Sequence, residues 1–117
     1  MNRTANQQDF IDSMADAASA IVKYFKENGG IIYFNVVANI SLACDCAGVD
    51  APPPKIKDIG ILATTDPIAI DQVCFDLIKK MNEAGTQPFL DQVAGLLGEN
   101  TIKKAEALNV GKKESFN

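Results

Sequence analysis

Residues 58–78 read DIGILATTDPIAIDQVCFDLI, and this stretch decides the fold class of the chain. Its first part, Asp58 to Ala63, is a short apolar run with the length of a buried strand. Asp66 and Pro67 then have the residue types favoured at a helix N-cap and at the first helical position. The next apolar side chains recur at helical spacing, at Ile70, Val73, Cys74, Leu77, Ile78 and Met81. The stretch therefore predicts a strand that leads directly into an amphipathic helix.

A second strand is predicted earlier in the chain. The run Ile31 to Ile40 is almost entirely apolar, is rich in β-branched and aromatic residues, and follows the turn residues Asn28, Gly29 and Gly30. Such a run suits a strand that is covered on both faces. Residues 9–27 before it predict a helix with one apolar stripe. The members of this stripe are Phe10, Ile11, Met14, Ala18, Ile21, Val22 and Phe25.

Two shorter helices are predicted at the end of the chain. One begins at Gln87 and Pro88 and ends at Gly98, and the other begins after a cap at Asn100 and Thr101. The whole order predicts an α/β fold, with a small sheet packed with about four helices. Because two strands make a poor sheet alone, we expect more strands from the tail, from a second copy or from a longer protein.

Length and composition predict a single domain over residues 1–117. The chain is long enough to bury a core without metals or disulfides. A net charge of −4 and only scattered lysines argue against nucleic acid or an anionic membrane as partner. We see no membrane span and no signal-peptide core, so we expect a cytoplasmic protein. Three cysteines, an odd number, fit reduced thiols.

The chain contains no histidine. This absence removes the usual general base near neutral pH, and it rules out the Ser-His-Asp and Cys-His arrangements. The glycine motifs that cradle phosphates are also absent from the sequence. Any chemistry must therefore come from cysteine, carboxylate, amine, hydroxyl or backbone groups.

Cys44 and Cys46 are the candidate metal ligands. They belong to a long loop, residues 41–57, that also contains the run Pro52 to Pro54. In an extended segment, residues i and i+2 point to the same side, roughly 6.5–7 Å apart. Two such thiolates suit zinc or an iron–sulfur cluster, although a closed site usually needs four ligands. The alternatives are a thiol-redox pair, or two small loop residues without a role.

Thr64, Thr65, Asp66 and Asp71 are the candidate cofactor-binding residues. The first three lie where a strand gives way to a helix N-terminus, a place where ligands bind in open α/β sheets. An ordinary helix cap at Asp66 and a solvated Asp71 are the simpler interpretation. If the two strands are parallel, these residues and the cysteine pair share one sheet edge. If the strands are antiparallel, they lie at opposite ends.

The chain resembles the C-terminal part of the domain of unknown function 362 family. The residues that carry this resemblance are the segment from Asn39 (NISLACDC), Pro54 and the stretch 58–78. Members read C-D-C, then a proline-containing loop, then D-I-G-I-L-A-S-x-D-P-V-A-L-D-Q. The resemblance is dense over residues 39–78 and extends more loosely towards Gly111. It implies that members are longer, with a preceding α/β half, and that many carry a ferredoxin-like insert for [4Fe–4S] clusters. This chain lacks the cysteine run of that insert, so the iron–sulfur label does not transfer with it.

The sequence leaves three functional hypotheses. The first is a domain of a metal-linked or iron–sulfur-linked redox protein, with Cys44 and Cys46 as ligands. The second is a non-catalytic interaction or oligomerisation module, and the third is a thiol-redox enzyme. The expected partner is a second copy, which makes a homo-oligomer, or the missing N-terminal half of the family architecture. The candidate cofactors are an iron–sulfur cluster or zinc.

Overall fold

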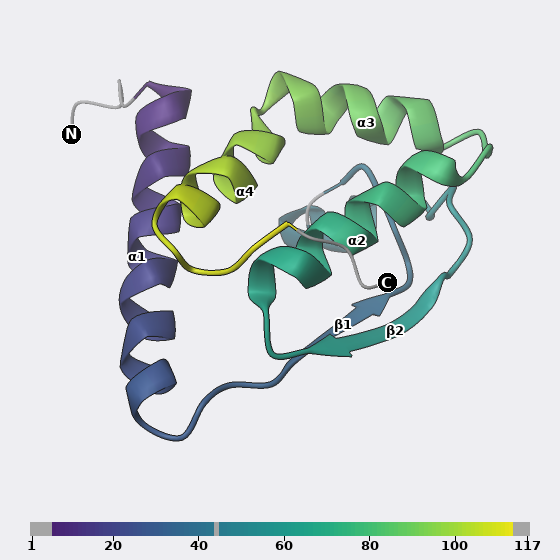
Figure 1. Cartoon of the computed structure of the whole chain (residues 1–117). Coiled ribbons are helices and arrows are strands. Elements are labelled where there is room, and N and C mark those ends of the chain that lie inside the picture. Colours follow the sequence, from purple (N-terminus) through teal and green to yellow (C-terminus); the bar gives the residue numbers. More distant parts are fainter. Residues whose placement is uncertain (1–5, 44, 114–117) are drawn as a thin grey trace.

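The computed structural model describes residues 6–43 and 45–113, and it has the predicted α/β fold (Figure 1). The structure has four helices, two strands and a short 3₁₀ helix, η1. In chain order they are α1 (Gln7–Glu27), β1 (Tyr33–Val37), η1 (Asp45–Asp50), β2 (Gly60–Thr64), α2 (Pro67–Lys80), α3 (Thr86–Gly95) and α4 (Gly98–Ala107). Both strands are shorter than the apolar runs that predicted them.

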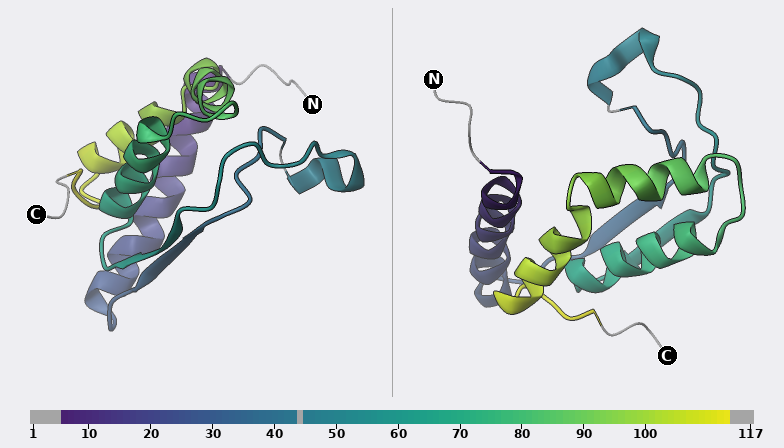
Figure 2. Two further views of the ribbon diagram at one scale, coloured as in Figure 1. Left: turned by 90° about the vertical axis from the view of Figure 1, so that its right-hand side faces the viewer. Right: turned by 90° about the horizontal axis from the view of Figure 1, so that it is seen from above.

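The two strands pair antiparallel and form the only sheet in the described part of the chain. The register sets Tyr33 opposite Thr64 and Val37 opposite Gly60. The connection between the strands, residues 38–59, does not fold back over the sheet. It projects away from the rest of the molecule and carries η1 near its tip (Figure 2).

Only one face of the sheet is covered. Helix α2 packs against both strands on that face, as the direct strand-to-helix connection requires. On the opposite face Phe34, Val36 and Ile61 are 66%, 67% and 69% exposed. The prediction of a strand covered on both faces is therefore wrong for the described chain. The run of residues is apolar throughout because the side chains on the uncovered face of the sheet are apolar too.

Helix α1 lies at one side of the molecule and packs against α4, which meets it obliquely (Figure 1). Asn6 caps it, because the Asn6 side chain accepts a hydrogen bond from the Gln8 amide at 3.2 Å. The buried residues of α1 are Ile11, Ala15, Ser19 and Val22. The predicted apolar stripe is only partly buried, since Phe10, Met14, Ile21 and Phe25 are exposed.

The buried core is divided into two clusters. One joins Ala15 and Val22 of α1 to Ile68, Ala105 and Val110. The other lies where the projecting loop meets the sheet and α2. Its buried members are Val37, Ile56 and Ile78. Tyr33 of β1 packs against the first cluster, and Leu62 of β2 packs against the second.

Helices α3 and α4 follow each other almost directly. Leu97 takes the left-handed conformation, with φ of 57°, and turns the chain between them. Gly98 is close to Val93, so that a Cβ there would overlap the valine side chain. Helix α4 begins at Gly98, before the predicted cap at Asn100. No strand follows α4 within the described residues.

Candidate functional site

Asp66 organises the junction between β2 and α2. Its Oδ1 atom accepts hydrogen bonds from the amides of Ile68 and Ala69, at 2.9 and 3.0 Å. These bonds satisfy two of the amides that a helix start leaves without partners. The Thr64 hydroxyl accepts a bond from the Asp66 amide at 3.2 Å. Asp66 is thus a helix cap, as the simpler interpretation of the sequence has it.

The other Asp66 oxygen, Oδ2, binds the end of the chain. It accepts a hydrogen bond from the Lys112 amide at 2.9 Å. Gly111 makes this approach possible, because a Cβ at Gly111 would overlap the Asp66 carboxylate. The Lys26 ammonium donates to the carbonyls of Asn109 and Val110 at 3.1 and 3.2 Å. Both carboxylate oxygens of Asp66 therefore accept hydrogen bonds from backbone amides.

Tyr33 is the titratable residue whose pKa is shifted most clearly by its surroundings. Its hydroxyl is buried and has no hydrogen-bond partner among the described residues. Burial, and secondarily the Asp66 carboxylate, raise the pKa of Tyr33 above its ordinary value of 10.0. Sequence reasoning missed Tyr33, because it belongs to an apolar run that core packing explains.

Asp71 lies on α2, is exposed, and contacts Asn35 of β1. Its Oδ1 atom accepts a hydrogen bond from the Asn35 side chain at 2.9 Å. The same Asn35 amide nitrogen lies 3.4 Å from the sulfur of Cys74. Asn35 is the one polar residue inside β1, and that position in the sequence was the signal that could have revealed it. Thr65 is exposed at the turn before α2.

The antiparallel strands separate the two predicted groups of site residues. Thr64 lies beside Tyr33 at the start of β1, whereas the loop with the cysteine motif leaves from the other end, after Val37. Cys44 and the side chain of Cys46 lie outside the part of the chain that the structure describes. The backbone of Cys46 belongs to η1, so it is not extended as the sequence interpretation assumed. The antiparallel pairing is thus the alternative in which the two groups belong to opposite ends of the sheet.

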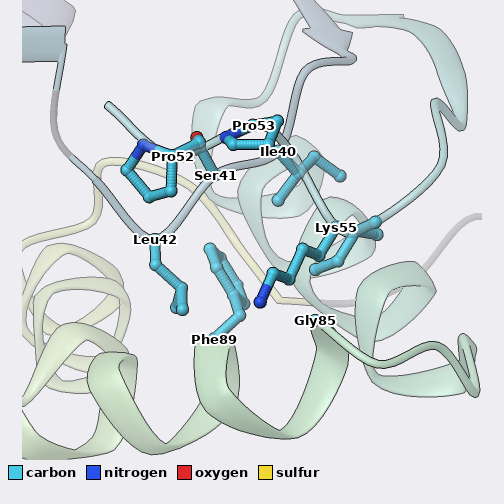
Figure 3. A pocket seen from close by; sticks show the side chains of 9 residues that line it. Ile40, Ser41, Leu42, Pro52, Pro53, Lys55, Gly85 and Phe89 are labelled. Atoms are coloured by element: carbon cyan, nitrogen blue, oxygen red, sulfur yellow. The ribbon is translucent and has the colours of Figure 1, made fainter. Parts of the chain in front are cut away.

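A small pocket lies where the two ends of the projecting loop meet α3 (Figure 3). Leu42 and Phe89 point towards each other across it, and the stem of Lys55 lies beside them. Pro52 and Pro53 border it on the loop side. Its volume of about 70 Å³ and its apolar lining suit the packing of the loop base more than the binding of a ligand.

Two larger hollows adjoin β1, and no β2 residue lines either of them. The edge hollow is lined by Phe34–Ala38, Ile40 and Cys74. The helical hollow lies between α1, α2 and α4 and reaches Tyr33. Its lining is mostly apolar and includes Met14, Ile21, Ile68 and Ile102. Each has a volume of about 310 Å³.

No three histidine, cysteine, aspartate or glutamate side chains that the structure describes lie close enough together to hold a metal ion. No helix in the same part of the chain has both the length and the apolar character that crossing a bilayer requires.

Comparison with known proteins gives one match. The sequence profile of the domain of unknown function 362 (DUF362) family matches residues 1–76, about two thirds of the chain and as far as the middle of α2. No curated protein and no solved structure matches the chain. The description of the family names no activity. The chain belongs to the DUF362 family.

Proposed function

We propose that this domain is a non-catalytic assembly module, and that the open face of its sheet packs against the same face of a second copy. The open face consists of Phe34, Val36 and Ile61, with Ala63 opposite Phe34 in the register. These exposed apolar side chains are the observation that carries the proposal. Contiguous exposed apolar patches on soluble proteins commonly mark interaction sites.

The chemistry of the open face suits a second copy. Its residues are uncharged, so two chains that each carry a net charge of −4 do not set like charges opposite each other across it. A two-fold axis brings the same patch from each chain together, which is the commonest arrangement in soluble oligomers. Apolar faces of two sheets then interdigitate at a spacing of about 10 Å.

The exposed area of the chain also leaves room for such an interface. A compact monomer of this mass exposes roughly 6,200 Å², whereas the chain exposes 8107 Å². A standard interface buries about 800 Å² on each partner. The radius of gyration, 15.4 Å, is likewise above the roughly 13.4 Å of a compact domain of this length.

Light scattering after size exclusion, over a roughly hundredfold range of concentration, tests the proposal. The wild-type chain is expected to reach the mass of two chains, and Phe34→Thr/Val36→Thr to keep the 12.5 kDa of one. Threonine is chosen because it suits a strand. Tyr24→Thr, which removes an exposed aromatic ring from α1, is the matched control and should associate like the wild type. A wild-type chain of single mass at every concentration would contradict the proposal.

The cysteine motif supports a second candidate, a metal or iron–sulfur site with Cys44 and Cys46 as ligands. The loop that carries them projects from the body of the molecule, where a partner has access to it (Figure 2). Two copies of the chain together supply four cysteines from this motif, the number that a closed tetrahedral site needs. Thr64, Thr65, Asp66 and Asp71 do not belong to this candidate, because they lie at the other end of the sheet.

Anaerobic reconstitution with zinc, or with iron and sulfide, tests this second candidate. The wild-type chain is expected to bind metal, and Cys44→Ser/Cys46→Ser to bind none. Cys74→Ser is the control, because Cys74 lies on α2 and contacts Asn35. Equal metal content in the wild type and the double variant would remove the candidate. Thiol-redox activity through the same pair would instead require a lowered thiol pKa, which a titration of the metal-free chain measures.

A further inference from the structure

The free edge of β1 is a second surface, distinct from the open face of the sheet. Each strand has one neighbour in the described sheet, so the backbone groups of β1 that point away from β2 have no strand partner there. The edge hollow follows these groups. Its lining contains five successive residues, Phe34–Ala38, and successive strand residues point to opposite faces. A hollow that touches all of them must lie along the edge itself.

The edge carries none of the devices that keep natural edges from pairing. Residues 28–43 contain no charged side chain and no proline. Charged residues, prolines and bulges are the usual protection of an exposed strand. The strand β1, rich in aromatic and β-branched residues, is therefore ready to accept another strand.

Helices α1, α2 and α4 border part of the space beside the edge. The helical hollow meets β1 at Tyr33, directly before the start of the edge hollow at Phe34. Met14 and Ile21 of α1 line this hollow and remain exposed. A strand added beside β1 would bring alternate side chains towards this hollow, where Met14 and Ile21 are exposed.

We propose that the free edge of β1 binds an extended segment of a different polypeptide, about five or six residues long, with bulky apolar side chains at alternate positions. The length follows from the five residues of β1, because paired strands match in length. Backbone hydrogen bonds would hold the segment, and the hollows would select its inward side chains.

A second copy of β1 does not fit this surface. Its inward-facing residues are Tyr33, Asn35 and Val37, and each is already engaged in its own chain. Tyr33 packs against the cluster of α1 and α4, and Val37 is part of the other cluster. Asn35 is bonded to Asp71. A copy would therefore complete the backbone pairing but bring no free side chain to fill the hollows.

The test uses the full chain and a synthetic peptide, Lys-Ile-Thr-Ile-Thr-Ile-Thr-Lys, as the probe. NMR-detected hydrogen exchange reports on each amide of the chain. At saturating peptide, the β1 amides that point away from β2 are expected to exchange roughly tenfold more slowly. The same peptide N-methylated at every Ile amide, and again at every Thr amide, is the control. One of the two should lose binding, because a strand pairs through alternate residues.

A pair of variants tests the hollow. Ile21→Glu introduces a charge into the helical hollow and should weaken peptide binding by about tenfold, since a buried charge is costly. Tyr24→Glu introduces the same charge on the same helix outside the hollow and should bind normally. Unchanged exchange of the β1 amides, or equal binding of both methylated peptides, would overturn the inference.

The result of the peptide-binding experiment is independent of whether the chain forms a dimer through the open face. The side chain of Ile61 is exposed on the open face and does not line the edge hollow, so Ile61→Thr should still bind the peptide. Loss of peptide binding with an intact dimer removes only the strand addition. A monomeric wild type that binds the peptide removes only the assembly through the open face.

Discussion

The Lys112 amide donates a hydrogen bond to Oδ2 of Asp66 at 2.9 Å, while Oδ1 of the same carboxylate caps α2. The Asp66 side chain thus forms hydrogen bonds with both the start of α2 and the end of the described chain. In the sequence, Asp66 is an ordinary capping residue. The second bond gives it a structural role that no local pattern contains, and it makes this junction a good place to measure stability.

Replacement of Asp66 by alanine should lower the free energy of unfolding by about 2 kcal/mol. Loss of the cap costs about 1 kcal/mol and loss of the Lys112 bond about as much. Urea denaturation followed by circular dichroism measures the change. Asp66→Asn should fall between, because its oxygen caps α2 while its amide nitrogen cannot accept from Lys112. Thr65→Ala, at the exposed neighbour, should change stability by less than about 0.5 kcal/mol. Similar losses at both positions would refute this role of Asp66.

Gly111→Ala should destabilise the fold by about 1–3 kcal/mol, because the new methyl group overlaps the Asp66 carboxylate. In Asp66→Ala/Gly111→Ala the overlap is absent, so the two losses should sum to more than the double variant shows. Gly95→Ala is the control, since a Cβ there meets nothing within 4 Å. Strict additivity in the double variant would mean that the two residues do not interact.

Tyr33→Phe should leave stability at neutral pH unchanged or raise it by about 1 kcal/mol, because it removes a buried hydroxyl that lacks a partner among the described residues. The pKa of Tyr33 is raised in the folded chain, so between pH 10.0 and that raised value the folded state holds a proton that the unfolded state has released. The stability that this gives is present in full below pH 10.0 and is lost as the pH rises through the folded pKa.

Unfolding free energies measured from pH 8 to 11 test this dependence, since the window brackets the ordinary tyrosine value of about 10. The decrease above pH 10.0 should be smaller in Tyr33→Phe than in the wild type. Tyr24→Phe, at an exposed ring, controls at neutral pH for the loss of a hydroxyl. Equal decreases in the wild type and Tyr33→Phe would show that Tyr33 is not responsible.

Asn35→Ala should cost about 0.5–1 kcal/mol, because it breaks the bond between the centre of β1 and Asp71 on α2. Asp71→Ala should cost a similar amount, and the double variant should lose little more than either single one. Denaturant titration of the three variants gives the coupling energy. A coupling energy of zero would show that the bond contributes nothing to the docking of α2 on the sheet.

The sequence was sufficient to predict the helices and strands, but not which of their faces are covered. The period of apolar residues from Ile70 to Met81 predicted α2, and Asp66 predicted its cap, because both are local signals. The exposure of Phe34 and Val36 could not be predicted, because an apolar run has the same composition whether or not another layer covers it. The direction of β2 was open for a related reason, since the loop before it is long enough for either pairing.

The site residues also divide into those that local sequence signals predicted and those whose partners are distant in the sequence. Thr64 and Asp66 lie where the sequence placed them, at the end of β2, but their hydrogen bonds go to the backbone. Tyr33 and Gly111 were missed because their roles depend on partners more than thirty residues away. Asn35 was visible as a polar residue in an apolar run, and it is the one missed residue that the pattern alone could have identified.

The pairing of α1 with α4 has a consequence for how the chain acquires its fold. These helices are the first and the last of the described chain, yet α1 packs chiefly on α4. During synthesis α1 emerges from the ribosome first and then waits until α4 has emerged before it finds its docking surface. Closing so long a loop is slow in comparison with local contacts. A chain cut short before Gly98 would therefore leave α1 without its neighbour, with its apolar side exposed to any other surface in the cell.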